Sequence, residues 1–300
     1  MKKVGRILLC TIPLIVYIVL QFGGSFAGSI VAGVMAGVEA GVTGNADNMA
    51  LMMQRMQEIY ADMVPVLIFG IHVIAIIVGA IWVYILFGKK KPGNPVKAFS
   101  WITIAVVVLC AVGLQYVCSS ALSLVQALNP ALLENYMQLM ESAGFMELNL
   151  FSIVASVCLA PIGEEILFRG VTLRLAKNAV KNFWIANSIQ AVCFGIAHMN
   201  MVQGIYAFFM GLVFGYIYEK YGSLYVPILL HALINFLGTV VSGVLESKMP
   251  ENAAEPGIGS CFMMLVVFAA VLTAGLVLMK KDKKIQEPVQ IEGEDEYATV

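Results

Sequence analysis

The stretch VPVLIFGIHVIAIIVGAIWVYILF, residues 64–87, contains no Asp, Glu, Lys or Arg. A helix needs about 20 mostly apolar residues to cross the hydrocarbon core of a bilayer, and this stretch is long enough. Across all 300 residues, 60% are hydrophobic and 12% are charged, and the mean hydropathy is +0.87. Water-soluble domains carry about twice as many charged residues. The composition therefore indicates a membrane protein and excludes a disordered chain, a basic nucleic-acid binder and a disulfide-rich secreted domain.

Seven further apolar stretches give eight candidate spans in all. They lie near residues 7–30, 64–87, 100–125, 149–174, 183–201, 203–218, 223–243 and 260–279. We therefore predict an all-α fold, a polytopic membrane helical bundle with about eight transmembrane helices. The expected parts are N-terminal transmembrane helices and loops over 1–148, a core with the candidate functional residues over 149–245, a last transmembrane helix region over 246–279 and a disordered cytoplasmic tail over 280–300.

The distribution of Lys and Arg predicts the orientation, because cytoplasmic loops carry an excess of both. With the N-terminus inside, 16 of the 18 basic residues lie on the inner side, and only Arg55 and Lys248 lie outside. We expect an integral protein of the cell membrane with cytoplasmic N- and C-termini. As an alternative, Lys2, Lys3 and the apolar run up to the small residues Ala27 and Gly28 could form a cleavable signal peptide.

Two features of the first 62 residues concern helix packing. Small residues recur every fourth position at Gly24, Gly28, Ala32 and Ala36, which suits close packing of helices in lipid. This packing could lie within one subunit or at a dimer interface. The methionine-rich segment 45–62 is interpreted either as an amphipathic surface helix or as a connector packed on the bundle.

Ionisable side chains inside a span are costly, and they are functional candidates for that reason. Three segments bring such side chains, or a polar amide, into predicted spans. They are APIGEEILFR over 160–169, FGIAH over 194–198 and HALIN over 231–235.

Helix geometry suggests how these residues divide their roles. Glu165 and Arg169 are four residues apart and can form an ion pair on one helix face. Glu164 is turned by about 100° from Glu165 and is free to point elsewhere. If the fourth and fifth spans form an antiparallel hairpin, Glu164 and His198 lie almost equally far from its turn near Lys181. The two side chains can then face each other.

A carboxylate, two imidazoles and an amide in one enclosed pocket suit hydrolysis of an amide bond. Glu164 could take a proton from water as general base, with His198 holding that water or sharing the proton. His231 and Asn235, four residues apart on the seventh span, could donate hydrogen bonds to the oxyanion. Alternatively, Glu164, His198 and His231 could bind a catalytic zinc ion with an open fourth position. The spacing does not distinguish the two schemes.

Two further residues have a predicted structural role. Pro161 has no N–H, so α-helical spacing predicts that the carbonyl of Val157 loses its donor. The resulting kink is compatible with a wet pocket, or with an ordinary packing kink. His72 has no polar neighbours on its own helix face, and we expect it to be a packed or interhelical histidine rather than a ligand.

The three polar segments carry a resemblance to a known family. Glu164-Glu165-x-x-x-Arg169, Phe194-x-x-x-His198 and His231-x-x-x-Asn235 resemble the motifs of the CPBP family, also called the Abi family, which comprises CAAX proteases and bacteriocin-processing or immunity proteins. The likeness covers residues 156–238.

This resemblance implies an intramembrane endopeptidase of the metalloendopeptidase type. Glu164 would activate water, and the other catalytic residues would be Glu165, Arg169, His198, His231 and Asn235. Zinc is the cofactor that the resemblance implies, with a metal-free glutamate mechanism as the alternative. The implied substrates are CAAX-type tails or bacteriocin-like and signal-peptide-like segments.

Two other functions could use the same pocket. One is a non-catalytic membrane immunity or binding protein. The other is a proton-coupled transporter, for which internal repeats would be expected, and the sequence has none that we would defend. The expected partners are membrane lipid and a membrane-associated peptide or protein substrate, and no nucleic acid is expected. The sequence does not indicate an oligomeric state.

Overall fold

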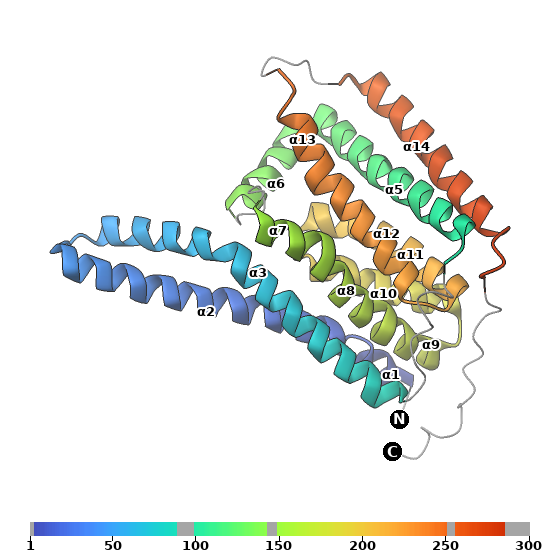
Figure 1. Ribbon diagram of the computed structural model, residues 1–300, viewed down its shortest axis with the longest axis horizontal. Coiled ribbons are helices and arrows are strands. Elements are labelled where there is room, and N and C mark those ends of the chain that lie inside the picture. Colours follow the sequence, from blue (N-terminus) through green and yellow to red (C-terminus); the bar gives the residue numbers. More distant parts are fainter. Residues whose placement is uncertain (1–2, 89–98, 143–148, 251–255, 286–300) are drawn as a thin grey trace.

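The computed structural model describes residues 3–88, 99–142, 149–250 and 256–285, and regular structure in these ranges is entirely helical (Figure 1). The α-helices are α1 (Lys3–Leu9), α2 (Ile12–Thr43), α3 (Met49–Phe87), α5 (Trp101–Leu128), α6 (Pro130–Ser142), α7 (Leu150–Val154), α8 (Ala160–Glu165), α9 (Arg174–Val180), α10 (Phe183–Ala197), α11 (Met201–Tyr221), α12 (Tyr225–Asn235), α13 (Ser242–Glu246) and α14 (Ile258–Met279). The π-helical segments are η1 (Ala155–Leu159), η2 (Ile166–Leu173) and η3 (Phe236–Val241). The predicted all-α membrane bundle is confirmed.

Seven helices in the described part of the chain are long and apolar enough to cross a membrane. Two of them, Leu150–Val180 and Tyr225–Glu246, are continuous helices that contain π-helical segments. The remaining predicted span, 183–201, corresponds to α10, which is apolar but has only 15 residues. It ends at Ala197 because the chain turns there, with Met199 in the left-handed region at φ 52° and Asn200 capping the next helix.

Helices α2 and α3 form a hairpin that projects away from the bundle (Figure 1). Their 32 and 39 residues correspond to about 48 and 58 Å, whereas the hydrocarbon core is about 30 Å thick. A Cβ at Gly24 would meet Ile71, and one at Gly28 would meet Leu67. The small-residue face thus packs within the subunit.

The methionine-rich segment 45–62 is mostly the first part of α3. Met52, Met56 and Met63 pack with Ala32 and Ala36 of α2. The segment is therefore neither a separate surface helix nor a connector on the bundle, because the helix that starts at the Asn48 cap runs straight into the second span.

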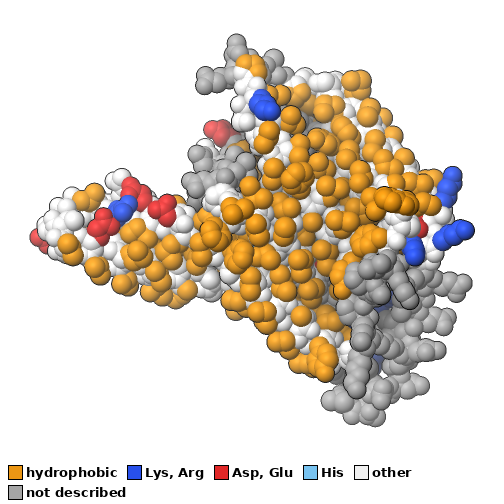
Figure 2. All heavy atoms as spheres, in the orientation of Figure 1, with side chains coloured by type: hydrophobic (Ala, Val, Ile, Leu, Met, Phe, Trp, Pro, Cys, Tyr) orange, Lys and Arg blue, Asp and Glu red, His pale blue; other side chains and the backbone are white. Residues whose placement is uncertain are grey.

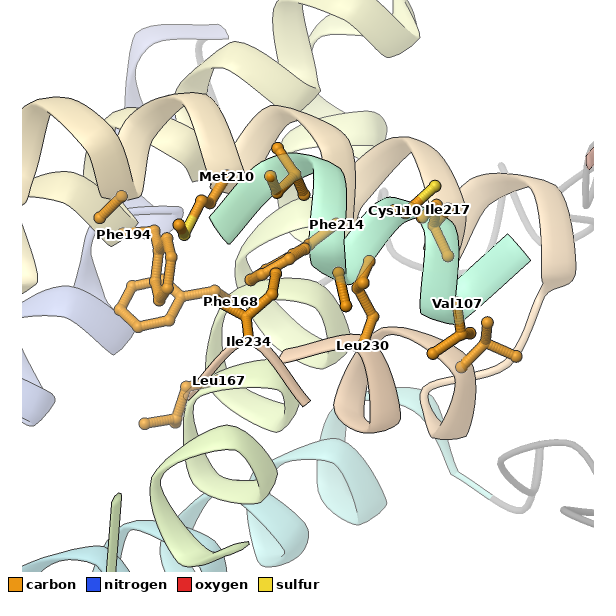
Figure 3. Packing of buried hydrophobic residues seen from close by; sticks show 14 of the residues in the cluster. Val107, Cys110, Leu167, Phe168, Phe194, Met210, Phe214, Ile217, Leu230 and Ile234 are labelled. Atoms are coloured by element: carbon orange, nitrogen blue, oxygen red, sulfur yellow. The ribbon is translucent and has the colours of Figure 1, made fainter. Parts of the chain in front are cut away.

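The bundle buries one main hydrophobic core, to which α5, α10, α11, α12 and η2 contribute (Figure 3). Phe168, Phe194, Phe214 and Leu230 are buried at its centre. The face of the bundle in Figure 2 is hydrophobic over most of its area, whereas charged side chains gather on the far half of the hairpin and at the edges of the bundle. This distribution matches a surface surrounded by lipid.

The start of the predicted C-terminal tail packs on the bundle. Asp282 is 5% exposed and accepts hydrogen bonds from Ser100, Thr103 and Tyr221. Residues 280–285 are thus ordered, because these buried donors hold the Asp282 carboxylate. The rest of the tail, 286–300, lies outside the described residues, as do residues 89–98.

Candidate active site

The site is built on the continuous helix of residues 150–180. It contains α8, with Glu164 and Glu165, between the π-helical segments η1 and η2. The N–H of Ala160 bonds to the carbonyl of Ala155, five residues earlier. Such wide turns are rare and occur frequently at functional sites. Here they rotate the two glutamates relative to a regular α-helix.

Asn235 compensates for the missing N–H of Pro161. With π spacing, the N–H at position 161 would bond to the carbonyl of Ser156, and proline has none. The Asn235 Nδ2 donates to the Ser156 carbonyl instead, at 2.8 Å. The sequence predicts that Pro161 leaves the Val157 carbonyl without its backbone donor. In the structure, the carbonyl that accepts from a side chain instead is that of Ser156, because the helix is π-helical there.

Glu165 joins Arg169 to His231. Its Oε1 accepts hydrogen bonds from Arg169 at 2.8 Å and from His231 Nδ1 at 3.0 Å, and the ion pair with Arg169 has the predicted four-residue spacing. The Arg169 guanidinium also lies 4.4 Å from the centre of the Phe194 ring and 5.0 Å from that of Phe214. A buried charge inside the membrane is thus balanced by a carboxylate and two aromatic faces.

Glu164 points to a different set of groups. Its Oε1 accepts a hydrogen bond of 2.8 Å from the Tyr17 hydroxyl, and its Oε2 lies 3.8 Å from His231 Nε2. His72 Nε2 lies 3.9 Å from Oε1 and 3.3 Å from the Tyr17 oxygen. The Glu164 carboxylate therefore lies between a fixed hydroxyl and two histidines.

His198 lies at the end of α10 and reaches this cluster through an aromatic ring. Its Nδ1 is 2.8 Å from the Phe194 carbonyl oxygen, which can only accept, so Nδ1 carries the hydrogen. The Phe194 ring lies edge-on to His198, with centroids 4.9 Å apart, and edge-on to His231, at 5.8 Å. The structure thus joins Glu164, Glu165, Arg169 and His231 by close contacts, and the Phe194 ring contacts both His198 and His231.

An open hydrophobic groove lies between α10 and α11. Its lining residues are Val192, Gly195, Ile196, Met199, Asn200, Met201, Gly204, Ile205, Phe208 and Phe209. Several of them are exposed, so the groove faces the surrounding lipid.

Sequence reasoning did not identify Tyr17, and it predicted the interhelical position of His72 but not its place in the site. The environment of His72 was inferred from its own helix face, whereas its polar neighbours lie on α2 and α8. His72 is an ionisable residue inside a predicted span, and the free-energy cost of placing it there is the signal that could have identified it as a site residue.

The predicted zinc ligands are Glu164, His198 and His231. Among the residues that the structure describes, no three His, Cys, Asp or Glu side chains are placed to hold a metal ion. The arrangement does not fit the three-ligand set that a catalytic zinc requires.

Comparison with known proteins concerns the segment that carries these motifs. Residues 146–237 match the family model described as "Type II CAAX prenyl endopeptidase Rce1-like". Over 83 residues, 28% of this chain, the sequence is 34% identical to the Bacillus subtilis (strain 168) protein named "Putative membrane peptidase YdiL". The aligned part spans about a third of that relative, 34% of its length. No solved structure matches the chain. All three motifs lie within residues 146–237, so the segment that carries them is the part of the chain that is similar to Rce1-like proteins.

Proposed function

We propose that this protein is an intramembrane endopeptidase that hydrolyses a peptide bond in a membrane-associated substrate. The observation that carries the proposal is the 3.8 Å separation between Glu164 Oε2 and His231 Nε2. This distance is too long for a direct hydrogen bond, and it leaves both atoms available to a shared water molecule. Both side chains are fixed from behind, Glu164 by Tyr17 and His231 by Glu165.

In this mechanism, Glu164 Oε2 accepts a proton from water while the water oxygen bonds to the carbonyl carbon of the scissile peptide. The π electrons of that carbonyl move to its oxygen. The oxyanion accepts hydrogen bonds from His231 and from the second amide hydrogen of Asn235. When the C–N bond breaks, the proton returns from Glu164 to the departing amine. His198, whose ring contacts the same Phe194 ring as His231, helps to hold the water.

The hydrophobic groove between α10 and α11 offers an apolar surface on the helix that ends at His198. We propose CAAX-type tails as the first substrates to test, because the matching family model describes a CAAX prenyl endopeptidase. Bacteriocin-like and signal-peptide-like segments form the second panel.

The experiment is cleavage of fluorogenic peptides from both panels by purified protein in liposomes. Glu164→Gln should lower kcat/KM by at least about 100-fold, the usual effect of losing a general base. Glu58→Gln, on the exposed part of the hairpin, is the matched control and should cleave like the wild type. Cleavage that survives Glu164→Gln would overturn the proposal.

The zinc alternative has its own measurement. Elemental analysis of the active protein and treatment with a chelator should give activity without stoichiometric metal if Glu164 works as proposed. Zinc near one per chain, with a loss of activity that added zinc reverses, would support the metalloendopeptidase alternative instead.

A further inference from the structure

We infer that Tyr17 and His72 are positioning residues for Glu164, so that the N-terminal hairpin completes the active site. The inference rests on the proposed function and extends it to two helices outside the matched segment 146–237. Tyr17 lies on α2 and His72 on α3, and both helices pack against the helix that carries Glu164.

Tyr17 is only 3% exposed, and its hydroxyl oxygen contacts both Glu164 and His72. The ring packs edge-on against Phe168, with centroids 6.0 Å apart, which fixes the direction of the hydroxyl. A phenol buried among apolar side chains needs such a hydrogen-bond partner. Here that partner is the carboxylate assigned as the base.

The donors and acceptors show that the three side chains act as one unit. His72 Nδ1 lies 2.8 Å from the Ile68 carbonyl oxygen, so Nδ1 carries a hydrogen. Tyr17 has a single hydrogen to donate. That hydrogen goes to Glu164 Oε1, and the Tyr17 oxygen also contacts His72 Nε2 at 3.3 Å. The Tyr17 oxygen thus links Glu164 to His72.

The hydrogen bond from Tyr17 determines which oxygen of the Glu164 carboxylate faces His231. It occupies Oε1 and leaves Oε2 facing His231. Without the Tyr17 hydroxyl, the carboxylate could rotate and present either oxygen in several orientations. Because the proposed reaction needs one oxygen beside the water, the expected loss is in kcat rather than in substrate binding.

Tyr17→Phe tests the inference because it removes the hydroxyl and keeps the ring. We expect kcat to fall by about tenfold or more, with KM within about twofold and an unchanged melting temperature. The matched control is Tyr84→Phe on α3, where the residue is 67% exposed, and it should behave like the wild type. A wild-type kcat in Tyr17→Phe, or a loss that follows the melting temperature, would overturn the inference.

His72 variants test the second half of the unit. His72→Gln keeps a donor toward Tyr17 and should retain more activity than His72→Phe. Because His72 acts through Tyr17, the double variant Tyr17→Phe/His72→Phe should have a kcat within about threefold of Tyr17→Phe alone. Fully multiplicative losses would show that the two residues act independently and would contradict the shared unit.

A spectroscopic readout separates this inference from the proposed function. 3-Fluorotyrosine placed at position 17 should show a 19F resonance that shifts on Glu164→Gln but not on Glu219→Gln, even if no peptide in the panels is cleaved. Absence of cleavage by the wild type would defeat the proposed function alone. An unshifted resonance would defeat the inference alone.

Discussion

Arg169 lies fully buried within a predicted span. Its guanidinium is held by a strong ion pair with Glu165 and by several weaker contacts. Besides Glu165, it contacts the Gly211 carbonyl at 3.3 Å and two aromatic rings. Breaking a buried pair by removing one partner is costly, since the other charge remains buried without compensation.

Arg169→Met should therefore destabilise the protein by about 3 to 5 kcal/mol, because Glu165 loses its counter-charge. Thermal unfolding in detergent measures this change. Arg55→Met is the comparison, because Arg55 forms ion pairs with Glu39 and Glu58 on the exposed part of the hairpin, and its melting temperature should stay within error of the wild type. Equal effects of the two substitutions would contradict the structural role of Arg169.

Asn235 and Pro161 act on the same backbone carbonyl, and substitutions can test whether their effects are coupled. Asn235→Ala leaves the Ser156 carbonyl without a donor and should cost about 1 to 3 kcal/mol of stability. Pro161→Ala supplies a backbone N–H to the same carbonyl. The stability loss from Asn235→Ala should consequently be smaller in the Pro161→Ala background, as measured by a double-mutant cycle of melting curves. Strict additivity would refute the compensation.

Residue spacing predicted part of this chemistry. The Glu165–Arg169 pair followed from a separation of four, and the different direction of Glu164 followed from the 100° turn between neighbours. The roles of Tyr17 and Ser156 could not be predicted, because one contact spans 147 positions in sequence and the other depends on a π-helical register that apolar periodicity does not reveal.

At the scale of helices, the crossing of α10 and α11 is the closest approach near the site. A Cβ on Gly195 would lie 2.6 Å from the Gly204 carbonyl oxygen, so the two backbones touch at this point. Gly195 is also only three residues before His198. Any separation of these helices should therefore move the His198 ring.

Gly195→Ala should lower stability by about 1 to 3 kcal/mol through overpacking and should also reduce peptide cleavage. Gly37→Ala is the matched control, because a Cβ there has no neighbour within 4 Å. Melting temperature and kcat/KM of the two variants provide the comparison. A Gly195→Ala protein as stable and active as the wild type would show that the crossing tolerates separation.

Helix existence was easier to predict than helix length. The run 64–87 indicated a span, but α3 begins at Met49, because a helix continues past the apolar run when its polar residues are capped and paired, as at Asn48 and Arg55. The opposite happened at α10, where the apolar run extends to 201 and the helix ends at Ala197. Hydropathy indicates which residues can be buried in lipid, but it does not indicate where the chain turns.

In the whole molecule, hydrogen bonds to Asp282 connect the C-terminal end of α14 to the start of α5 and the end of α11. Burial by itself would raise the pKa of Asp282, but hydrogen bonds from Thr103, the Lys284 N–H, Ser100 and Tyr221 outweigh it and lower the pKa below the usual value. A carboxyl with a lowered folded-state pKa stabilises the fold above its unfolded pKa and loses that contribution as pH falls through the folded pKa.

Stability should thus fall as the pH drops through the acid range below about 4, where an ordinary Asp begins to protonate. Asp282→Asn should be less stable at neutral pH and should show a weaker decrease on acidification. Melting temperatures between about pH 3 and pH 7 measure both effects. An unchanged pH dependence in Asp282→Asn would place the acid sensitivity elsewhere.

The matched segment does not contain the whole site. Composition and hydropathy predicted the bundle, and three motifs predicted the main polar cluster, yet the partners of Glu164 come from the first two long helices. Side chains that meet only after folding leave no local pattern in the sequence. The cytoplasmic location of both termini remains a prediction from the distribution of basic residues.

The position of Tyr17 has a consequence for how the protein could be processed. α2 continues without interruption past Ala27 and Gly28, so a leader-type cut there would sever the helix and carry away the phenol that holds Glu164. Such a cut would work as an irreversible off-switch rather than as maturation. Intact-mass measurement of the membrane-extracted, active protein should accordingly find the N-terminal helix still attached.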